Sequence, residues 1–191
     1  MNLLVNGSFE DVGLAPGVQT LATNTWANYS SLPGWSSGPY GIEVRNNVAG
    51  QAQDGNHFVE LDTTRNSIAM QSLTTIAGEL YELSFFYAAR PGTSGMAADT
   101  NNIAVYWNNV QLGLSTGVGT GSTHNWLRFD YAVLGTGTDT LEFRALGTSD
   151  SHGGSLDNVS LQQVPEPGSI ALVLGALVAA GAVRRRQDRQ A

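Results

Sequence analysis

The chain has 191 residues, of which 41% are apolar, with 23 glycines and neither cysteine nor lysine. These absences exclude thiolate chemistry, Cys-ligated metal centres, a lysine nucleophile and a P-loop. The net charge of −7 divides unevenly, because residues 1–164 carry five Arg against fourteen acids and residues 165–191 carry four Arg against two. An acidic body does not follow a phosphate backbone, so nucleic acid is not expected as a partner.

Short runs of β-branched and aromatic residues, separated by Gly, Pro, Asn and Asp, predict about ten strands. In chain order these cover residues 3–5, 42–44, 58–61, 68–73, 80–88, 103–107, 110–112, 126–134, 140–145 and 156–161. Asn108-Asn109 predicts a two-residue hairpin turn, because asparagine tolerates positive φ. No long amphipathic helix pattern interrupts these runs, so the sequence predicts an all-β sandwich or jelly roll over residues 1–163.

Alternation within the expected strands separates a core face from a face that mixes aromatic and charged side chains. The side chains assigned to the mixed face include Trp126, Arg128, Tyr106 and Arg144. We predict that these four lie on neighbouring strands as a ligand-binding platform, with rings for the C–H faces of a sugar and polar groups for its hydroxyls. The alternative for any single Trp is packing against other side chains.

Four motifs follow one another in a fixed order. They are Asn6-Gly7-Ser8-Phe9-Glu10, Pro33-Gly34-Trp35, the run from Asp54 to Leu61 and the run from Ser155 to Leu161. This order resembles the galactose-binding-like jelly rolls, meaning the family 4/9/22-type carbohydrate-binding modules and the related DUF642 domains. The resemblance implies a jelly-roll β-sandwich in which Trp35 is buried, and it does not specify a ligand.

The same resemblance implies a structural calcium site. Glu10, just after the first expected strand, and Asp157, in the last one, match the carboxylates that often hold Ca²⁺ in those modules. Hard cations take carboxylate and carbonyl oxygens, and Asn6, Asp54 and Asn56 are further oxygen donors. The alternative is that both acids cap turns or accept hydrogen bonds from the backbone.

Catalysis has little support in the sequence. The three histidines are His57, His124 and His152, and neither a Gly-x-Ser-x-Gly elbow nor an HExxH motif is present. Paired carboxylates for glycoside hydrolysis are defined by their separation in space, which a sequence does not give. We therefore expect no enzyme activity and assign no catalytic residue.

Residues 164–191 form a separate tail in this interpretation. Pro165-Glu166-Pro167 ends the folded part, because two prolines around one residue interrupt both helices and central strands. Residues 170–183 are uncharged and rich in Leu, Val and Ala, which predicts a transmembrane helix; at about 21 Å it is shorter than the roughly 30 Å hydrocarbon core. Arg184, Arg185 and Arg186 follow, and such a cluster stays on the cytoplasmic side.

The order of a Pro-Glu-Pro motif, an apolar helix and an arginine cluster resembles the PEP-CTERM sorting signal of Gram-negative bacteria. In that family an integral-membrane exosortase is believed to cut near the Pro-Glu-Pro motif, in cells that produce exopolysaccharide and form biofilms. Such proteins normally begin with a secretory signal peptide, whereas Met1 leads directly into Asn2-Leu3-Leu4 without a basic region or a long apolar stretch. We therefore expect an upstream extension that encodes a leader.

Together these features predict an exported, non-catalytic, Ca²⁺-stabilised protein. It would pass through a form anchored in the inner membrane by the C-terminal helix and reach the cell surface or extracellular matrix. The expected partners are an exosortase-type membrane enzyme and extracellular polysaccharide. Two alternatives stay open, a structural surface or biofilm protein without a small ligand and a small glycan-active enzyme.

Overall fold

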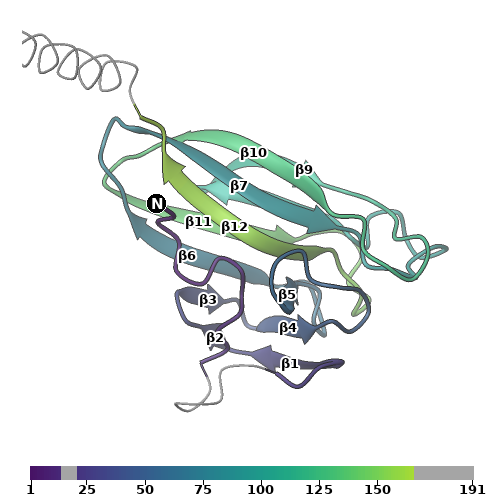
Figure 1. The fold of residues 1–191 in the computed structure, drawn as a ribbon. Coiled ribbons are helices and arrows are strands. Elements are labelled where there is room, and N and C mark those ends of the chain that lie inside the picture. The colour runs from purple at the N-terminus through teal and green to yellow at the C-terminus, as the bar shows by residue number, and fades with distance from the viewer. Residues whose placement is uncertain (14–20, 166–191) are drawn as a thin grey trace, which may run out of the picture.

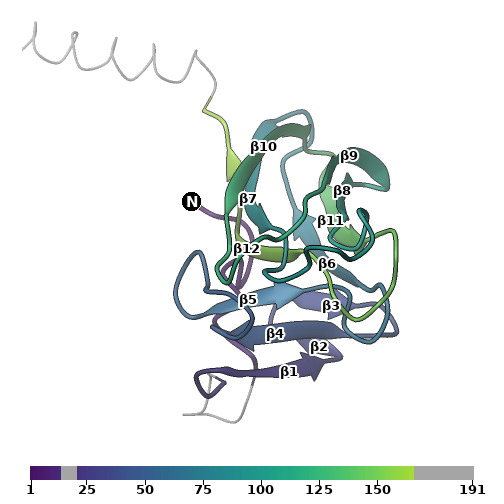
Figure 2. The same ribbon diagram turned by 90° about the vertical axis from the view of Figure 1, so that its right-hand side faces the viewer.

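The computed structural model describes residues 1–13 and 21–165, and its labelled strands form two six-stranded antiparallel sheets packed face to face (Figures 1 and 2). Sheet A has the order β1-β4-β5-β12-β7-β10, and sheet B has the order β2-β3-β6-β11-β8-β9. The strands of sheet A are β1 (Thr25–Tyr29), β4 (Ile42–Asn46), β5 (His57–Glu60), β7 (Leu80–Ala88), β10 (Leu127–Leu134) and β12 (Ser155–Gln163). Those of sheet B are β2 (Ser31–Leu32), β3 (Trp35–Ser37), β6 (Ile68–Thr74), β8 (Ile103–Trp107), β9 (Val110–Ser115) and β11 (Thr138–Ala145). The predicted all-β jelly-roll sandwich is confirmed.

Every predicted strand except residues 3–5 overlaps a strand of the structure. Residues 3–5 do not form one, because Val5 bonds to the side chain of Gln71 instead of to a neighbouring backbone. The strands β1, β2 and β3 were not predicted. They are short, and β1 and β3 contain polar residues at most positions that flank their aromatic ones, so no apolar alternation marks them.

The core lies between the two sheets and is organised around aromatic rings. Trp35 on β3 is 2% exposed, as the resemblance implied, and its ring centroid lies 5.2 Å from that of Phe9 and 6.3 Å from that of Phe143. Phe143 on β11 meets Phe85 on β7 edge to face at 5.0 Å, which joins sheet B to sheet A. Fully burying a side chain of this size stabilises the fold by about 1.5–3 kcal/mol.

The predicted hairpin turn is confirmed. Trp107 pairs with Val110, so Asn108 and Asn109 alone connect β8 to β9. Their φ values are +50° and +65°, which is the backbone of the two-residue turn that matches the twist of the flanking strands. The Asn108 side chain also accepts a hydrogen bond from the backbone N–H of Thr140, at 2.8 Å, and so ties the turn to β11.

The N-terminal segment joins the two sheets. It runs beside β12, where the backbone N–H of Val159 donates to the carbonyl of Gly7 at 2.8 Å and that of Leu3 donates to Leu161 at 2.9 Å. On its other side Val5 exchanges two hydrogen bonds with the amide of Gln71 on β6, at 2.8 and 3.0 Å. Residues 3–9 therefore occupy the side of β12 that β5 leaves free beyond Leu156.

Replacing Gly7 with Ala tests this docking. A Cβ atom at position 7 would lie 2.1 Å from the carbonyl oxygen of Val159, so the segment must move away from β12. We expect a loss of about 1–3 kcal/mol in the free energy of unfolding, the usual cost of overpacking, measured by denaturant titration. The neighbouring substitution Ser8→Ala is the control and should change little. Equal stability of the two variants would show that the segment does not dock as described.

A candidate functional site on the outer face of sheet A

The register of sheet A directs a set of polar and aromatic side chains away from the core. Their strand neighbours Val44, Val59, Leu156 and Phe85 belong to the core cluster, and strand alternation therefore turns the intervening residues outward. The outward set is Glu43 and Arg45 on β4, Phe58 and Glu60 on β5, Ser155 and Asp157 on β12, Phe86 on β7 and Arg128 on β10. This outer face of sheet A is the most elaborate polar surface among the described residues.

Two carboxylates and two guanidiniums form a buried ion cluster on this face. Arg45 contacts both Glu43 and Glu60, with 3.2 Å from its Nε to Glu60 Oε2, and Arg90 Nη1 lies 2.8 Å from Glu60 Oε1. Glu60 has no exposed surface. Burial raises the pKa of Glu60 to about 8, although both guanidiniums act in the opposite direction. Contact with the two guanidiniums offsets part of the cost of burying both acids.

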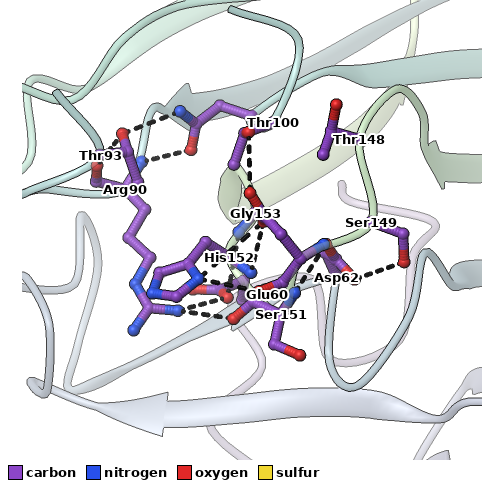
Figure 3. A network of polar contacts seen from close by, with 12 residues as sticks. Glu60, Asp62, Arg90, Thr93, Thr100, Thr148, Ser149, Ser151, His152 and Gly153 are labelled. Carbon is purple, nitrogen blue, oxygen red and sulfur yellow. Dashed lines mark hydrogen bonds and ion pairs between the residues drawn. The ribbon is translucent and has the colours of Figure 1, made fainter. Parts of the chain in front are cut away.

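Loop residues fix the far side of the ion cluster (Figure 3). Glu60 also accepts the backbone N–H of Gly153 at 3.2 Å, and Arg90 also donates to the carbonyl of Ser151 at 3.2 Å. Beside it, the buried carboxylate of Asp62 accepts the backbone N–H groups of Asp150, at 2.8 Å, and Ser151, at 3.1 Å. These bonds hold the loop before β12 against β5. The ion cluster thus connects strands β4 and β5 to the loop before β12.

A small group of aromatic rings lies next to the ion cluster. The imidazole of His124 and the indole of Trp126 pack on Phe58, with centroid distances of 4.7 and 6.0 Å. Both rings also bond to the carbonyl of Gln51, from His124 Nδ1 at 2.9 Å and Trp126 Nε1 at 3.0 Å. Trp126 is therefore a half-buried packing residue that secures the β4–β5 loop, which is the alternative that the sequence left open for any single Trp.

His124 and Ser155 form a pair that resembles a nucleophile and its base. Ser155 Oγ lies 3.1 Å from His124 Nε2, and the bond from Nδ1 to Gln51 leaves Nε2 as the acceptor. Burial lowers the pKa of His124, so its ring is neutral at pH 7. Ser155 has no exposed surface, however, and a hydroxyl that no substrate can reach serves packing and not catalysis.

A groove of about 390 Å³ opens on the same face, toward β10. Phe86 lies half-buried among the lining residues, and Arg128 is ion-paired with Glu82 at 3.1 Å and with Asp130 at 2.7 Å. The lining residues are Glu82, Ser84, Phe86, Arg128, Asn158, Ser160, Gln162, Gln163, Val164 and Pro165. An aromatic ring surrounded by amides, hydroxyls and charged groups can contact both the C–H groups and the hydroxyls of a polar ligand.

The structure does not bring the four predicted platform residues together, and that part of the prediction is wrong. Trp126 and Arg128 lie at β10 in sheet A, whereas Tyr106 and Arg144 lie on β8 and β11, on the outer face of sheet B. The reason is that residues 135–137 carry the chain from one sheet to the other, so β10 and β11 do not pair. Any role of these residues in ligand binding stays a prediction.

Tyr106 and Arg144 contact each other on the outer face of sheet B. The guanidinium carbon of Arg144 lies 4.0 Å above the centroid of the Tyr106 ring, which is a cation–π arrangement. Arg144 also makes two hydrogen bonds to Glu142, at 2.7 and 2.8 Å, and one to Asn109. The guanidinium covers one face of the Tyr106 ring, so that face is not open to a ligand.

The two predicted calcium ligands hold one loop from two sides. Asp157 accepts backbone N–H groups from Gln53 at 2.8 Å, Asp54 at 3.0 Å and Asn158 at 2.6 Å. Burial raises the pKa of Asp157 to about 8, and these N–H groups oppose the rise. The carboxylate has no exposed surface, so it acts as an internal acceptor for the turn that precedes β5.

Glu10 completes this anchor. Its Oε1 accepts the N–H groups of Asn56, at 2.8 Å, and His57, at 2.7 Å. The backbone of residues 53–57 thus donates hydrogen bonds to two acids, one from each end of the folded chain. The described part of the chain contains no group of three or more His, Asp or Glu side chains that could hold a metal ion. The donors that surround both acids match the backbone alternative, and calcium binding stays a prediction.

The predicted sorting residues lie largely beyond the described part of the chain. Pro165 is its last residue and is exposed, and the backbone N–H of Val164 donates to the carbonyl of Leu80 at 2.8 Å. Glu166, Pro167, residues 170–183 and Arg184 to Arg186 lie outside the described residues. Within residues 1–13 and 21–165, no helix has the length and apolar character needed to cross a membrane.

Replacing Asp157 with Asn distinguishes backbone hydrogen bonding from calcium binding by this acid. An amide offers one acceptor oxygen where the acid serves three N–H groups, so a purely backbone role predicts a lower melting temperature, by the same amount in EDTA and in Ca²⁺. Thermal unfolding of the wild type and of Asp157→Asn in both solutions measures this, with Glu10→Gln beside them. A stabilisation by Ca²⁺ that the wild type shows and both variants lose would contradict a purely backbone role and demonstrate the predicted calcium site.

Comparison with known proteins gives a family assignment for the tail. The family model described as the PEP-CTERM protein-sorting motif matches residues 163–187. The predicted sorting signal is thereby confirmed at the level of the motif. The match covers the Pro-Glu-Pro sequence, the apolar run and the arginine cluster, and it begins at the last residue of β12.

Two relatives align with most of the chain. Both are described as multifunctional-autoprocessing repeats-in-toxin, from Vibrio cholerae serotype O1 and Vibrio vulnificus. They are 29% identical over 161 residues and 30% identical over 163 residues, and each alignment covers 83% of this chain. The chain spans only 3% of the length of either toxin, so the similarity concerns one small segment of each.

Solved structures of similar shape show the fold. A Stig cyclase from Fischerella sp. TAU superposes with a TM-score of 0.60 at 15% identity, over 86% of this chain and 97% of the cyclase. TmCBM61, solved in complex with β-1,4-galactotriose, gives 0.51 at 18%, over 86% and 99%. The K1 adhesin domain of Lys-gingipain from Porphyromonas gingivalis W83 gives 0.56 at 15%, over 75% and 100%. The chain thus joins a jelly-roll sandwich, a fold it shares with carbohydrate-binding modules, to a PEP-CTERM protein-sorting motif.

Proposed function

We propose that this is an exported, non-catalytic protein that binds polysaccharide through the groove beside Arg128 and Phe86. The observation that carries the proposal is the composition of that groove, in which a half-exposed aromatic ring is surrounded by hydroxyl, amide and charged groups. A sugar ring has two kinds of surface, apolar C–H faces and polar hydroxyl groups. Phe86 suits the first, and Ser84, Asn158 and Arg128 suit the second.

The arrangement of charges supports binding over catalysis. Each carboxylate of the buried ion cluster is paired with a guanidinium, and the hydroxyl of Ser155 is inaccessible. The groove itself holds Glu82, which is ion-paired with Arg128 at 3.1 Å. A glycan-active enzyme needs one carboxyl kept protonated near a second one that the substrate can reach. Burial raises the pKa of Glu60 beside Glu43, but neither side chain is open to a substrate. The structural likeness to TmCBM61, which was solved with a galactotriose, agrees with a binding role.

The tail defines the route by which the domain reaches its ligand. In our proposal, residues 170–183 insert into the inner membrane with Arg184 to Arg186 on the cytoplasmic side, because basic residues set the orientation. Pro165-Glu166-Pro167 then lies just outside the bilayer, where an exosortase-type membrane enzyme can reach it. The body is delivered to the cell surface or the exopolysaccharide matrix of a Gram-negative, biofilm-forming cell.

One observation favours a second candidate, a structural surface protein without a small ligand. Arg128 is already paired with Glu82 and Asp130, so the groove is electrostatically satisfied without a ligand. In that case the outer face of sheet A would serve only to stabilise the domain. The binding experiment that follows distinguishes the two.

Replacing Arg128 with Ala should weaken polysaccharide binding. Losing hydrogen bonds to a charged group costs about 1.5–3 kcal/mol, which is a roughly 10- to 150-fold weaker affinity. Stability should change little, because the Arg128 side chain is 51% exposed. A glycan array that contains β-1,4-galactotriose and bacterial exopolysaccharides identifies a ligand, and calorimetry then compares Arg128→Ala and Phe86→Ala with wild type.

Arg144→Gln is the matched control for that experiment, because Arg144 is also ion-paired on a strand but faces outward from sheet B. It should bind as wild type does. Equal loss in Arg128→Ala and Arg144→Gln would contradict a site confined to sheet A. No binding to any arrayed glycan or to polysaccharide from the native host would favour the structural alternative.

The processing proposal predicts a shortened mature protein. Mass spectrometry of the surface fraction from the native host should find a C-terminus near Pro165 to Pro167, because this Pro-flanked stretch lies between the domain and the membrane segment. Deleting residues 165–191 should change where the body is found without changing its melting temperature. A surface protein that still ends at Ala191 would show a permanent anchor and contradict processing.

A further inference from the structure

Large apolar side chains are exposed together at one end of the sandwich. Leu80 and Leu134 are cross-strand partners on β7 and β10, and they are 45% and 55% exposed. Ile76, 57% exposed, lies in the β6–β7 turn, whose backbone bonds to the β10–β11 turn. The Trp107 indole donates to the carbonyl of Leu134 at 3.0 Å, and its strand partner Val110 is 65% exposed. We call Ile76, Leu80, Val110 and Leu134 the apolar end.

The apolar end carries little exposed charge, although the body as a whole is acidic. Its buried acid, Asp139, is 1% exposed and points inward to Thr75, Asn108 and Thr136. Burial would raise the pKa of Asp139, but these hydrogen bonds prevail and lower it to about 2. The turns at this end therefore present apolar and small polar groups, with Glu79 as a half-buried acid beside them.

The chain leaves the domain at this same end. The backbone N–H of Val164 donates to the carbonyl of Leu80, so the last described residues lie directly against the apolar end, and Figure 1 shows β12 ending beside the β6–β7 connection. Four residues, 166–169, separate Pro165 from the apolar run that begins at Ile170. Even fully extended, the five steps from Pro165 to Ile170 span at most about 18 Å.

We propose that the apolar end rests on the lipid surface of the inner membrane while the tail is inserted. The proposal rests on the insertion of residues 170–183 that the proposed function requires. The interfacial layer of a bilayer is about 5–7 Å thick on each side of the hydrocarbon core, so a linker of at most about 18 Å keeps the domain next to it. Of the surfaces near the exit point, the apolar end gains most from contact with lipid.

This docking sets the orientation of the domain before processing. The groove is lined at one end by Val164 and Pro165 and extends along β12 and β10 away from the apolar end. Its open side therefore faces along the membrane, and polysaccharide can reach it while the protein is still anchored. Release from the membrane would then expose the apolar end for the first time.

A fluorescent label on a single cysteine tests the proposal in the full chain, which has no cysteine of its own. Leu134→Cys and Leu127→Cys place an environment-sensitive dye at opposite ends of β10, at sites that are 55% and 49% exposed. The two sites are about 23 Å apart along the strand. The labelled proteins are reconstituted into vesicles of phosphatidylcholine and phosphatidylglycerol, and flotation reports whether the tail has inserted.

In floated protein we expect a blue shift at position 134, together with loss of emission when the lipids carry headgroup nitroxides, and neither change at position 127. Floated protein with the same emission at both positions would overturn the docking and leave the tail insertion intact. Failure to float would overturn the insertion and the docking together. A dye at position 134 that is already shielded before lipid is added would show self-association through this end and would also overturn the proposal.

Discussion

Strand β12 is the constraint on which the rest of the structure depends. It lies between β5 and β7 in sheet A, and its register shifts between Asp157 and Ser160, where Asn158 adopts a φ of +48°. Before the bulge β12 pairs with β5, and after it the N-terminal segment takes over that side through Gly7 and Leu3. Because of this bulge, β12 pairs with β5 and β7 and also bonds to the N-terminal segment. Through Asp157 it contacts the β4–β5 loop as well.

The β4–β5 loop determines which part of the outer face of sheet A is covered. With residues 53–57 held by Glu10 and Asp157, the loop supplies the Gln51 carbonyl that fixes His124 and Trp126. Gly55 permits the approach of Glu10, because a Cβ atom there would lie 2.4 Å from the carboxylate and φ is +62°. The ion cluster and the aromatic rings lie to one side of β12, and the groove with Arg128 lies toward β10. The anchored β4–β5 loop thus covers the part of the outer face with His124 and Trp126, and the groove beside Arg128 stays open.

Local patterns in the sequence predicted much of the fold but not the composition of the site. The bounds predicted for β7 and β8 are those observed, and the asparagine turn followed from backbone preference. The assignment of strands to sheets did not follow, since no local pattern records that residues 135–137 cross between layers. For that reason Arg128 and Arg144 were placed together. The ion cluster had one signal in the sequence, the charged Glu43, Arg45 and Glu60 within the short buried strands β4 and β5.

The central position of β12 also determines when the domain can fold. Because β12 is the last strand of the described residues, no strand joins β1-β4-β5 to β7-β10 until residues 155–163 have been synthesised. During that interval β5 and β7 each present an unpaired edge, the kind of surface through which chains aggregate. The strand pairs that close the sheet join residues far apart in the sequence, such as Leu156 with Val59 and Ser155 with Ala88, and such non-local pairing is slow. The sheet can close only after β12 has been synthesised, so this one strand sets the earliest moment at which the native fold can form.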